Sequence, residues 1–310
     1  MSIRLYEPAE LDPAALTRRK GATTISVCLP ARNEANTVGA ILDVITAELM
    51  APAGAPLVDE LLVLDDGSTD ATAAVAAAHG ARVVTVDTVL PEVGPGRGKG
   101  NVLWRSLAAA TGDVIVWCDA DVTSFRAGYV CGLVAPLLED PAIGFVKGFY
   151  DRPTAEGGHG GGRVTELVAR PLLSRFFPGL AALRQPLAGE MAGRREVLEA
   201  VPFVQGYGVE TGLLIDVSHR FGLDSLVQVD LGVRRHRHQP LAALAVQATE
   251  VLQVVHDRIG LPSEHGKVDL QRADGSAVEV PLVQWPPMAG LRSQESARPS
   301  SRTAEQGVGS

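Results

Sequence analysis

Two aspartates, Asp119 and Asp121, follow the apolar run at residues 114–118 with one residue between them. Carboxylates spaced in this way, just past a buried strand, can both reach one site as the chain turns. Mg²⁺ and Mn²⁺ prefer such hard oxygen ligands and also take oxygens from phosphates. A metal that bridges a diphosphate neutralises the charge that builds on a leaving nucleotide. The pair therefore predicts a metal-dependent nucleotide diphosphate site, with an exposed acidic turn as the alternative.

Two more polar clusters end earlier apolar runs. PARNE at residues 30–34 follows one run, and LDDGSTD at residues 64–70 ends the next. Ser68 or Thr69 could simply cap the following helix. A helix N-terminus that points into the same crevice would also favour a bound anion. Three polar strand ends in one half of the chain indicate a shared site.

A glycine-rich segment at residues 94–100 superficially resembles a phosphate-binding P-loop. Val93 stands where that motif requires glycine, and Gly100 stands where it requires serine or threonine. We therefore exclude an NTPase of that class. Lys99 remains a candidate contact for a diphosphate or a base, and a flexible turn is the alternative.

The second half of the chain contains a possible anion site and a possible metal ligand. Gly162, Arg163, Val164 and Thr165 open a predicted helix, whose free N–H groups and dipole favour an anion. Arg163 adds a planar donor fork suited to phosphate or carboxylate, unless it is only a surface residue beside a flexible linker. Strand alternation at residues 235–238 would place both histidines on one face, where a neutral imidazole can complete a metal shell. A solvated basic edge strand is the alternative there.

The elements that must position these residues alternate along the first half. Strands are predicted at residues 24–29, 61–64, 82–86 and 114–118, with helices at 35–49, 70–78 and 101–110. This order indicates an α/β fold with a mostly parallel sheet and helices on both faces. Ligands of such sheets bind beyond the carboxyl ends of the strands, where the polar clusters lie.

The second half is predicted to be less regular. We expect helices at residues 164–176, 195–200, 209–221 and 241–259, strands at 225–229 and 232–238, and a hairpin with strands at 268–270 and 278–280. The chain thus divides into an N-terminal extension (1–22), a regular α/β half (23–150), a second half with a mobile glycine-rich loop (151–240), a C-terminal helix and hairpin (241–285) and a disordered tail (286–310). The helix and hairpin are a candidate contact for a homodimer.

Composition narrows the class of protein. The chain has 310 residues, 46% hydrophobic content and a formal net charge of −8, which argues against a general nucleic-acid binder. No signal peptide or membrane-spanning run is evident, so we expect no membrane partner. Three cysteines in apolar or helical contexts favour reduced thiols and a cytoplasmic protein.

The motifs carry a family resemblance. PARNE, LDDGSTD, GKGNVLWRSLAAATGD and CDAD resemble the nucleotide-sugar half of GT-A glycosyltransferases. GGGRVTELVARPLL, QPLAGE, GYGVETGLLID and LGVRRHRHQPL resemble actinobacterial glucosyl-3-phosphoglycerate synthases, and the likeness covers about residues 20 to 260. The resemblance implies a retaining transfer of glucose from UDP-glucose to 3-phosphoglycerate, helped by Mg²⁺ or Mn²⁺.

The resemblance also implies roles for individual residues. The residues that would hold the UDP part of the donor are Pro30, Ala31, Arg32, Asn33, Glu34, Ser68, Lys99, Asp119 and Ala120. Asp121 and His236 would bind the metal. The sugar side would be lined by Tyr207, Gly208, Val209 and Glu210, with Glu210 orienting hydroxyls or steadying positive charge at the anomeric carbon. Those that would hold the acceptor are Gly162, Arg163, Val164 and Thr165, with His238 beside them.

Other functions share part of this pattern. GDP-mannose could be the donor, or another small phosphorylated or carboxylate compound the acceptor. A lipid-phosphate acceptor is disfavoured because no membrane segment is evident and because Arg163 suits a small anion. A sugar nucleotidyltransferase would need a glycine-rich NTP loop where PARNE stands. A non-catalytic nucleotide-sugar-binding protein would have little use for Asp121, His236 and Arg163 together.

Overall fold

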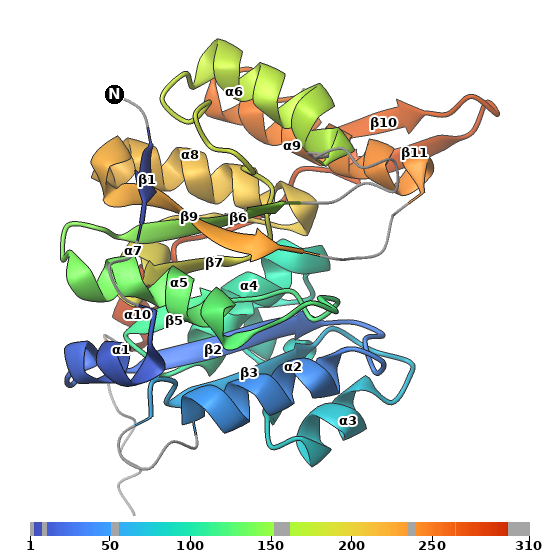
Figure 1. The fold of residues 1–310 in the computed structure, drawn as a ribbon. Helices are drawn as coiled ribbons and strands as arrows, with labels where there is room; N and C mark the ends of the chain where they lie inside the picture. The colour runs from blue at the N-terminus through green and yellow to red at the C-terminus, as the bar shows by residue number, and fades with distance from the viewer. Residues whose placement is uncertain are drawn as a thin grey trace, which may run out of the picture.

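The computed structural model describes residues 3–7, 11–50, 56–151, 162–234, 240–263 and 265–296, with the side chains of 293–296 left out. Its centre is an eight-stranded sheet with the order β1-β9-β6-β7-β5-β2-β3-β4 (Figure 1). The strands are β1 (Arg4–Tyr6), β2 (Ile25–Ala31), β3 (Glu60–Asp65), β4 (Arg82–Thr85), β5 (Val114–Trp117), β6 (Phe145–Asp151), β7 (Met191–Arg194) and β9 (Leu226–Val233).

The sheet is mostly parallel, as the sequence predicted. β7 alone among these strands runs antiparallel to its neighbours β5 and β6, and the remaining neighbours pair in parallel. The carboxyl ends of β2, β3, β5 and β9 therefore meet at one edge. β7 begins at that same edge, so the residue before β7 also faces it.

Alternation along the strands divides the core between the two faces of the sheet. Val27 and Leu29 of β2 pack in one cluster and Cys28 in the other, and all three are fully buried. The first cluster joins the sheet to α1 (Pro13–Lys20), α2 (Val38–Ile45), α3 (Thr72–Ala78) and α5 (Ala127–Glu139). The second joins it to α4 (Gly98–Ala109), α7 (Arg195–Glu199), α8 (Val209–Phe221) and α10 (Met288–Ser296).

A C-terminal group of elements stands beside the sheet. α9 (Leu241–Arg258) lies near α6 (Arg170–Phe176) and α8, and the hairpin of β10 (Lys267–Gln271) and β11 (Ala277–Pro281) extends beyond it (Figure 1). β12 (Gln284–Trp285) then pairs with β8 (Phe203–Val204). The predicted helix over 241–259 and the predicted hairpin are both confirmed.

The structure differs from the sequence prediction at several boundaries. The prediction of a disordered tail from residue 286 is wrong for α10. Met288 is buried, and Leu291 packs against the hydrophobic cluster on the side of the sheet that α4 covers. The N-terminal extension is built into the fold, since β1 pairs with β9 and α1 contacts α5. The strands predicted at 225–229 and 232–238 form one strand to Val233, and residues 235–239 lie outside the described part.

Helices α4 and α2 begin at other residues than predicted. α4 starts at Gly98, three residues earlier than expected, after Arg97 in extended conformation. α2 starts at Val38 and passes into a π-helical turn, Thr46–Met50. Over the residues that the structure describes, none of the helices combines the length and the apolar character needed to cross a membrane.

Candidate active site

The ends of β2 and β3 interlock through Asn33. Asn33 has a positive φ of 59°, a conformation that asparagine tolerates better than most residues. Its backbone N–H donates to Ser68 Oγ at 3.0 Å, and its Oδ1 accepts from the Thr69 backbone N–H at 2.8 Å. The Glu34 backbone N–H donates to Thr72 Oγ1 at 2.8 Å. The PARNE and LDDGSTD segments therefore form one joined turn, and Ser68 serves this turn instead of capping α3.

The other predicted donor residues of this turn differ in exposure. Ala31 is buried within β2, where it pairs with Asp65, and Pro30 precedes it in the same strand. Arg32 points into solvent, with 66% of its side chain exposed, and its Nη1 lies 3.9 Å from Asp66 Oδ2. Burial raises the pKa of Asp66 above its usual range. This edge therefore offers both a cation and acidic oxygens to a polar ligand.

Lys99 lies between two carboxylates from different elements. Its Nζ donates to Asp119 Oδ1 at 2.6 Å and lies 3.0 Å from Glu210 Oε1. Burial opposes the charge on Lys99, yet the two carboxylates raise its pKa well above the usual range. Lys99 thus stays protonated in this setting. The structure brings together three sequence-predicted residues from α4, the end of β5 and the start of α8.

Arg234 completes the cluster, and sequence reasoning missed it. It directly follows β9 and is 4% exposed. Its Nη2 donates to Asp119 Oδ2 and to Asp121 Oδ1, each at 2.9 Å, and its Nη1 donates to Glu190 Oε2 at 2.9 Å. Burial would raise the pKa of Asp119, but Lys99 and Arg234 together lower it below its usual range. Asp119 therefore remains ionised between two fixed positive charges.

Glu190 and Gly189, which directly precede β7, contact Arg234 and Asp119 of this cluster. Burial raises the pKa of Glu190, although Arg234 opposes the shift. A Cβ atom added to Gly189 would lie 2.1 Å from Asp119 Oδ2, so only glycine lets the chain approach the aspartate this closely. The string QPLAGE contains both residues, but their function depends on strand β7 entering at this edge. No local spacing rule identifies them.

The two aspartates suit a divalent cation. Their oxygens converge on a single guanidinium nitrogen, which shows that one point beside both carboxylates favours positive charge. Carboxylate oxygens are the ligands that Mg²⁺ and Mn²⁺ prefer. Within the described ranges, no third histidine, cysteine or acidic residue completes a metal-binding group. The predicted ligand His236 lies outside the described residues, as does His238.

The sugar-side segment predicted from the sequence begins α8. Tyr207 and Gly208 belong to a 3₁₀ turn, Gly206–Gly208, and Val209 and Glu210 open the helix. Gly208, Val209 and Glu210 are buried, whereas Tyr207 is 45% exposed. Since Glu210 also pairs with Lys99, this segment faces the Asp119 cluster.

The predicted acceptor segment forms a separate helix start. Gly162 accepts the first helical hydrogen bond, from the Glu166 backbone N–H at 2.9 Å. Arg163 is exposed, whereas Val164 and Thr165 are buried against the elements beneath. The first N–H groups of a helix have no partner within it, so this end can accept an anion. The following turn, Thr165–Ala169, packs on α9.

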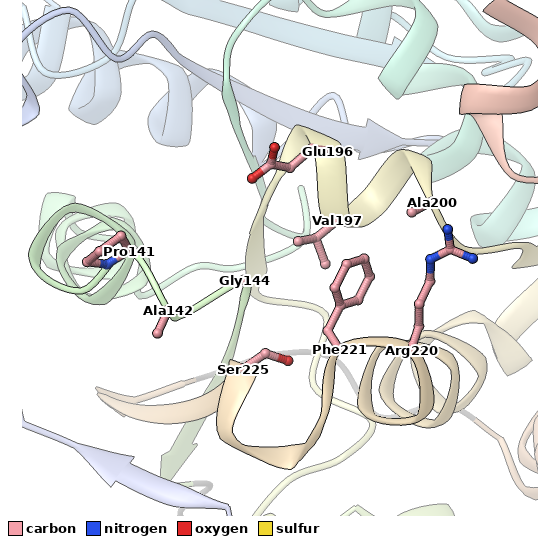
Figure 2. Close-up of a pocket in the computed structure, with 9 residues that line it drawn as sticks. All are labelled: Pro141, Ala142, Gly144, Glu196, Val197, Ala200, Arg220, Phe221 and Ser225. Carbon is pink, nitrogen blue, oxygen red and sulfur yellow. The ribbon is translucent and has the colours of Figure 1, made fainter. Parts of the chain in front are cut away.

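A surface hollow elsewhere on the molecule lies away from this cluster. Figure 2 shows its lining side chains, among them Glu196, Phe221 and Arg220, around Gly144 and Ser225. Gly144 precedes β6 and Ser225 precedes β9, so the hollow is at the amino ends of these strands. The Asp119 cluster is at the opposite edge, where ligands of parallel sheets bind.

Comparison with known proteins places this geometry in a family. The model of glycosyl transferase family 2 matches residues 26–199. The glucosyl-3-phosphoglycerate synthase of Mycolicibacterium smegmatis is 48% identical over 90% of this chain and 93% of its own length. The enzyme of that name from Petrotoga mobilis is 44% identical over 87% of this chain and 88% of its own.

Solved structures agree. A crystal structure of glucosyl-3-phosphoglycerate synthase from Mycobacterium tuberculosis, in complex with Mn²⁺, UDP and glucosyl-3-phosphoglycerate, superposes with a TM-score of 0.84 at 44% identity. The match covers 94% of this chain and 100% of that one. The same enzyme with Mn²⁺, UDP-glucose and phosphoglyceric acid also gives a TM-score of 0.84, at 45% identity, over 94% and 99% of the two chains. The predicted GT-A fold is confirmed.

Proposed function

Because the chain belongs to glycosyl transferase family 2 and, within it, to the glucosyl-3-phosphoglycerate synthases, we propose that it transfers glucose from UDP-glucose to 3-phosphoglycerate with retention of configuration. The observation that carries the proposal is the cluster of Asp119, Asp121, Lys99 and Arg234 at the carboxyl edge of the sheet. Fixed positive charges beside ionised carboxylates suit a substrate that combines a diphosphate with polar sugar groups.

The donor's UDP part would lie along the joined turn of β2 and β3. Pro30 to Glu34 and Ser68 would contact the nucleoside, and Asp119 and Ala120 would bound it from the end of β5. Lys99 and Arg234, with side chains 13% and 4% exposed, supply two cations near the place of the diphosphate. Charge that develops on the departing UDP would be stabilised by groups that are already in position.

Asp121 and His236 would hold Mg²⁺ or Mn²⁺. A divalent cation bound there would supply charge neutralisation for the diphosphate. The carboxylate chemistry of Asp121 supports this assignment, since its oxygen already faces a cation.

Glu210 would act on the sugar side, together with Tyr207, Gly208 and Val209. Its carboxylate is buried and pairs with Lys99, which holds its oxygens in one place close to the transferred glucose. An ionised carboxylate can orient sugar hydroxyls and steady positive charge at the anomeric carbon. We assign Glu210 no covalent step.

The acceptor 3-phosphoglycerate would lie at the helix start formed by Gly162, Arg163, Val164 and Thr165, with His238 beside it. The helix N-terminus and the guanidinium fork both suit a phosphate or carboxylate. The division of the chain into a donor half and an acceptor half rests on this assignment.

We propose a homodimer whose contact includes α9 and the β10–β11 hairpin. The hairpin projects from α9 (Figure 1), and Leu261 after that helix is 63% exposed. Light scattering coupled to gel filtration tests this, and a monomer mass at micromolar concentration would contradict it.

We also propose that the enzyme works in the cytoplasm. Cys28, Cys118 and Cys131 are free and buried, as expected in a reducing compartment. Burial raises the pKa of Cys28 and of Cys131 to about 12, so these thiols are inert. Fractionation of producing cells would test the location.

The deciding experiment offers the purified protein UDP-glucose or GDP-mannose with 3-phosphoglycerate, with and without Mn²⁺ or Mg²⁺. Mass spectrometry should detect a metal-dependent hexosyl-phosphoglycerate from UDP-glucose. Asp121→Ala should abolish this product, whereas Asp269→Ala, at an exposed carboxylate of β10, should not. Product formed only from GDP-mannose would show that the donor is GDP-mannose and not UDP-glucose. Absence of product from both donors would reject 3-phosphoglycerate as the acceptor.

A further inference from the structure

Helix α9 carries a buried carboxylate, Glu250, that contacts two segments proposed to bind the donor. Glu250 is 4% exposed. Its Oε2 accepts from the Tyr207 backbone N–H at 2.7 Å, and its Oε1 lies 3.3 Å from Arg97 Nη1. Tyr207 begins the sugar-side segment, and Arg97 directly precedes the helix that carries Lys99. One side chain from the C-terminal part thus joins two donor-side segments that are far apart in sequence.

These two segments also contact each other directly, and their backbones are closely packed. The Gly206 backbone N–H donates to the Arg97 carbonyl at 3.1 Å, and the Arg97 N–H donates to Gln205 Oε1 at 3.0 Å. A Cβ atom at Gly98 would lie 2.9 Å from Gly206 Cα. Gly206 itself has a φ of +74°, and a Cβ there would lie 2.4 Å from Glu250 Oε1. The turn at Gly206 therefore packs directly against the Glu250 carboxylate, with no room for a side chain between them.

A buried carboxylate costs stability unless hydrogen bonds and an opposite charge compensate it. Burial raises the pKa of Glu250, while the Tyr207 N–H and Arg97 act in the opposite direction. Both compensating groups belong to the donor-side segments and neither belongs to α9. The carboxylate therefore stabilises the relative placement of those segments rather than the helix that bears it.

We propose that Glu250 is a positioning residue for the sugar part of the donor. It fixes the Gly206–Tyr207 turn and thereby places Tyr207 and Glu210 against the transferred glucose. The contacts to UDP along β2 and β3 do not involve this turn. The inference rests on the proposed function, because it assumes that the segment from Tyr207 to Glu210 faces the donor's sugar.

The test compares the dissociation constants of UDP and UDP-glucose, measured by calorimetry in the presence of Mn²⁺. Glu250→Met, which removes both contacts, should raise the ratio of the UDP-glucose constant to the UDP constant about tenfold, the effect of one charge-assisted hydrogen bond. Glu250→Gln, which keeps an acceptor for the Tyr207 N–H, should raise the ratio less and keeps the test valid if the methionine variant fails to fold.

The matched control is Gln253→Leu. Gln253 is buried on the same helix, and its Nε2 donates to the Val280 carbonyl at 2.9 Å, away from the donor-side turn. This variant should leave the ratio unchanged, and the glutamate variants should leave the KM for 3-phosphoglycerate unchanged. An unchanged ratio of the two dissociation constants in the glutamate variants, including the case in which UDP and UDP-glucose both bind equally more weakly, would overturn the positioning role. Failure of the unaltered protein to bind either ligand would instead reject the proposed donor.

Discussion

At the scale of single residues, the site depends on charges that hold one another in place. Asp119 is shared by Lys99 and Arg234, which come from different halves of the chain. Arg163 lies on a different element, at the exposed start of the helix that leads into the turn Thr165–Ala169. Under the proposed function the two groups contact different substrates, so we expect substitutions to separate their effects.

Replacing Arg163 by alanine should weaken the use of the acceptor. Loss of one charge-assisted contact to an anion predicts a KM for 3-phosphoglycerate about tenfold higher or more, with the KM for UDP-glucose nearly unchanged. Steady-state kinetics with each substrate varied in turn measures this. Arg175→Ala, at an exposed arginine of α6, serves as the control. Equal changes in both KM values would show that Arg163 acts on the fold and not on the acceptor.

Lys147 should make stability depend on pH. It is buried on β6 with its Nζ donating to the Ala188 carbonyl at 2.6 Å, and burial lowers its pKa from 10.5 to about 8, despite the opposing effects of Glu210 and Glu190. The unfolded chain therefore binds more protons between pH 8 and 10.5, so the free energy of unfolding rises with pH across this window.

Urea unfolding of the unaltered protein and of Lys147→Met measures this effect. Relative to the variant, the unaltered protein should gain about 2 kcal/mol as pH rises from about 7 to about 10. Lys267→Met, at a lysine exposed on the hairpin, should show no such change in this range. A difference that is constant with pH would contradict a lowered pKa for Lys147.

At the scale of elements, the start of α4 is fitted closely to β8. A Cβ atom at Gly100 would lie 1.8 Å from the Val204 carbonyl oxygen, which is backbone and cannot rotate away. The helix begins early, at Gly98, because this glycine-rich segment allows it to approach β8 and the Gly206 turn. The same glycines that suggested a flexible turn in the sequence therefore serve close packing.

Gly100→Ala should thus lower the free energy of unfolding by about 2–3 kcal/mol through overpacking. Gly290→Ala is the matched variant, since Gly290 is also helical but has no atom within 4 Å of its added Cβ. There alanine's higher helix propensity should stabilise the protein by about 0.5–1 kcal/mol. Chemical denaturation measures both, and effects of the same sign would contradict the packing argument.

At the scale of the whole molecule, the C-terminal segment returns to the core. The rings of Trp104 and Trp285 stack with centroids 4.9 Å apart, and Trp285 Nε1 donates to Asn101 Oδ1 at 3.0 Å. Trp104 Nε1 donates to the Pro286 carbonyl at 2.9 Å. α10 then covers part of the α4 face of the sheet. Residues 284–292 are therefore part of the folded unit.

Trp285→Ala should destabilise the protein by about 2–4 kcal/mol, because it removes the ring stack, a hydrogen bond and buried apolar area. Val283→Ala, two residues earlier at a side chain that is 42% exposed, should change stability by less than about 0.5 kcal/mol. Thermal and urea unfolding provide the comparison. A small effect at Trp285 would mean that the C-terminal segment contributes little to the core.

The sequence by itself determined the α/β class, the mostly parallel sheet and the polar residues at the carboxyl ends of its first strands. These features depend on local alternation and on turn chemistry, which short segments encode. It predicted that PARNE, LDDGSTD and CDAD would meet at one edge, and the pairing of β2 with β3 and β5 brings their ends together.

Only the tertiary structure decided which charges meet. Arg234 reaches Asp119 across 115 residues of sequence, and Glu250 reaches Tyr207 across 43. These pairs depend on β7 entering the sheet in reverse and on α9 packing beside α8, and neither follows from local periodicity. α10 was likewise not predicted, because its polar composition is typical of a disordered tail. Only the contacts of Met288 and Leu291 with the hydrophobic core show that it is folded. Contacts between distant segments are set by the order of the strands, and that order is a property of the folded chain as a whole.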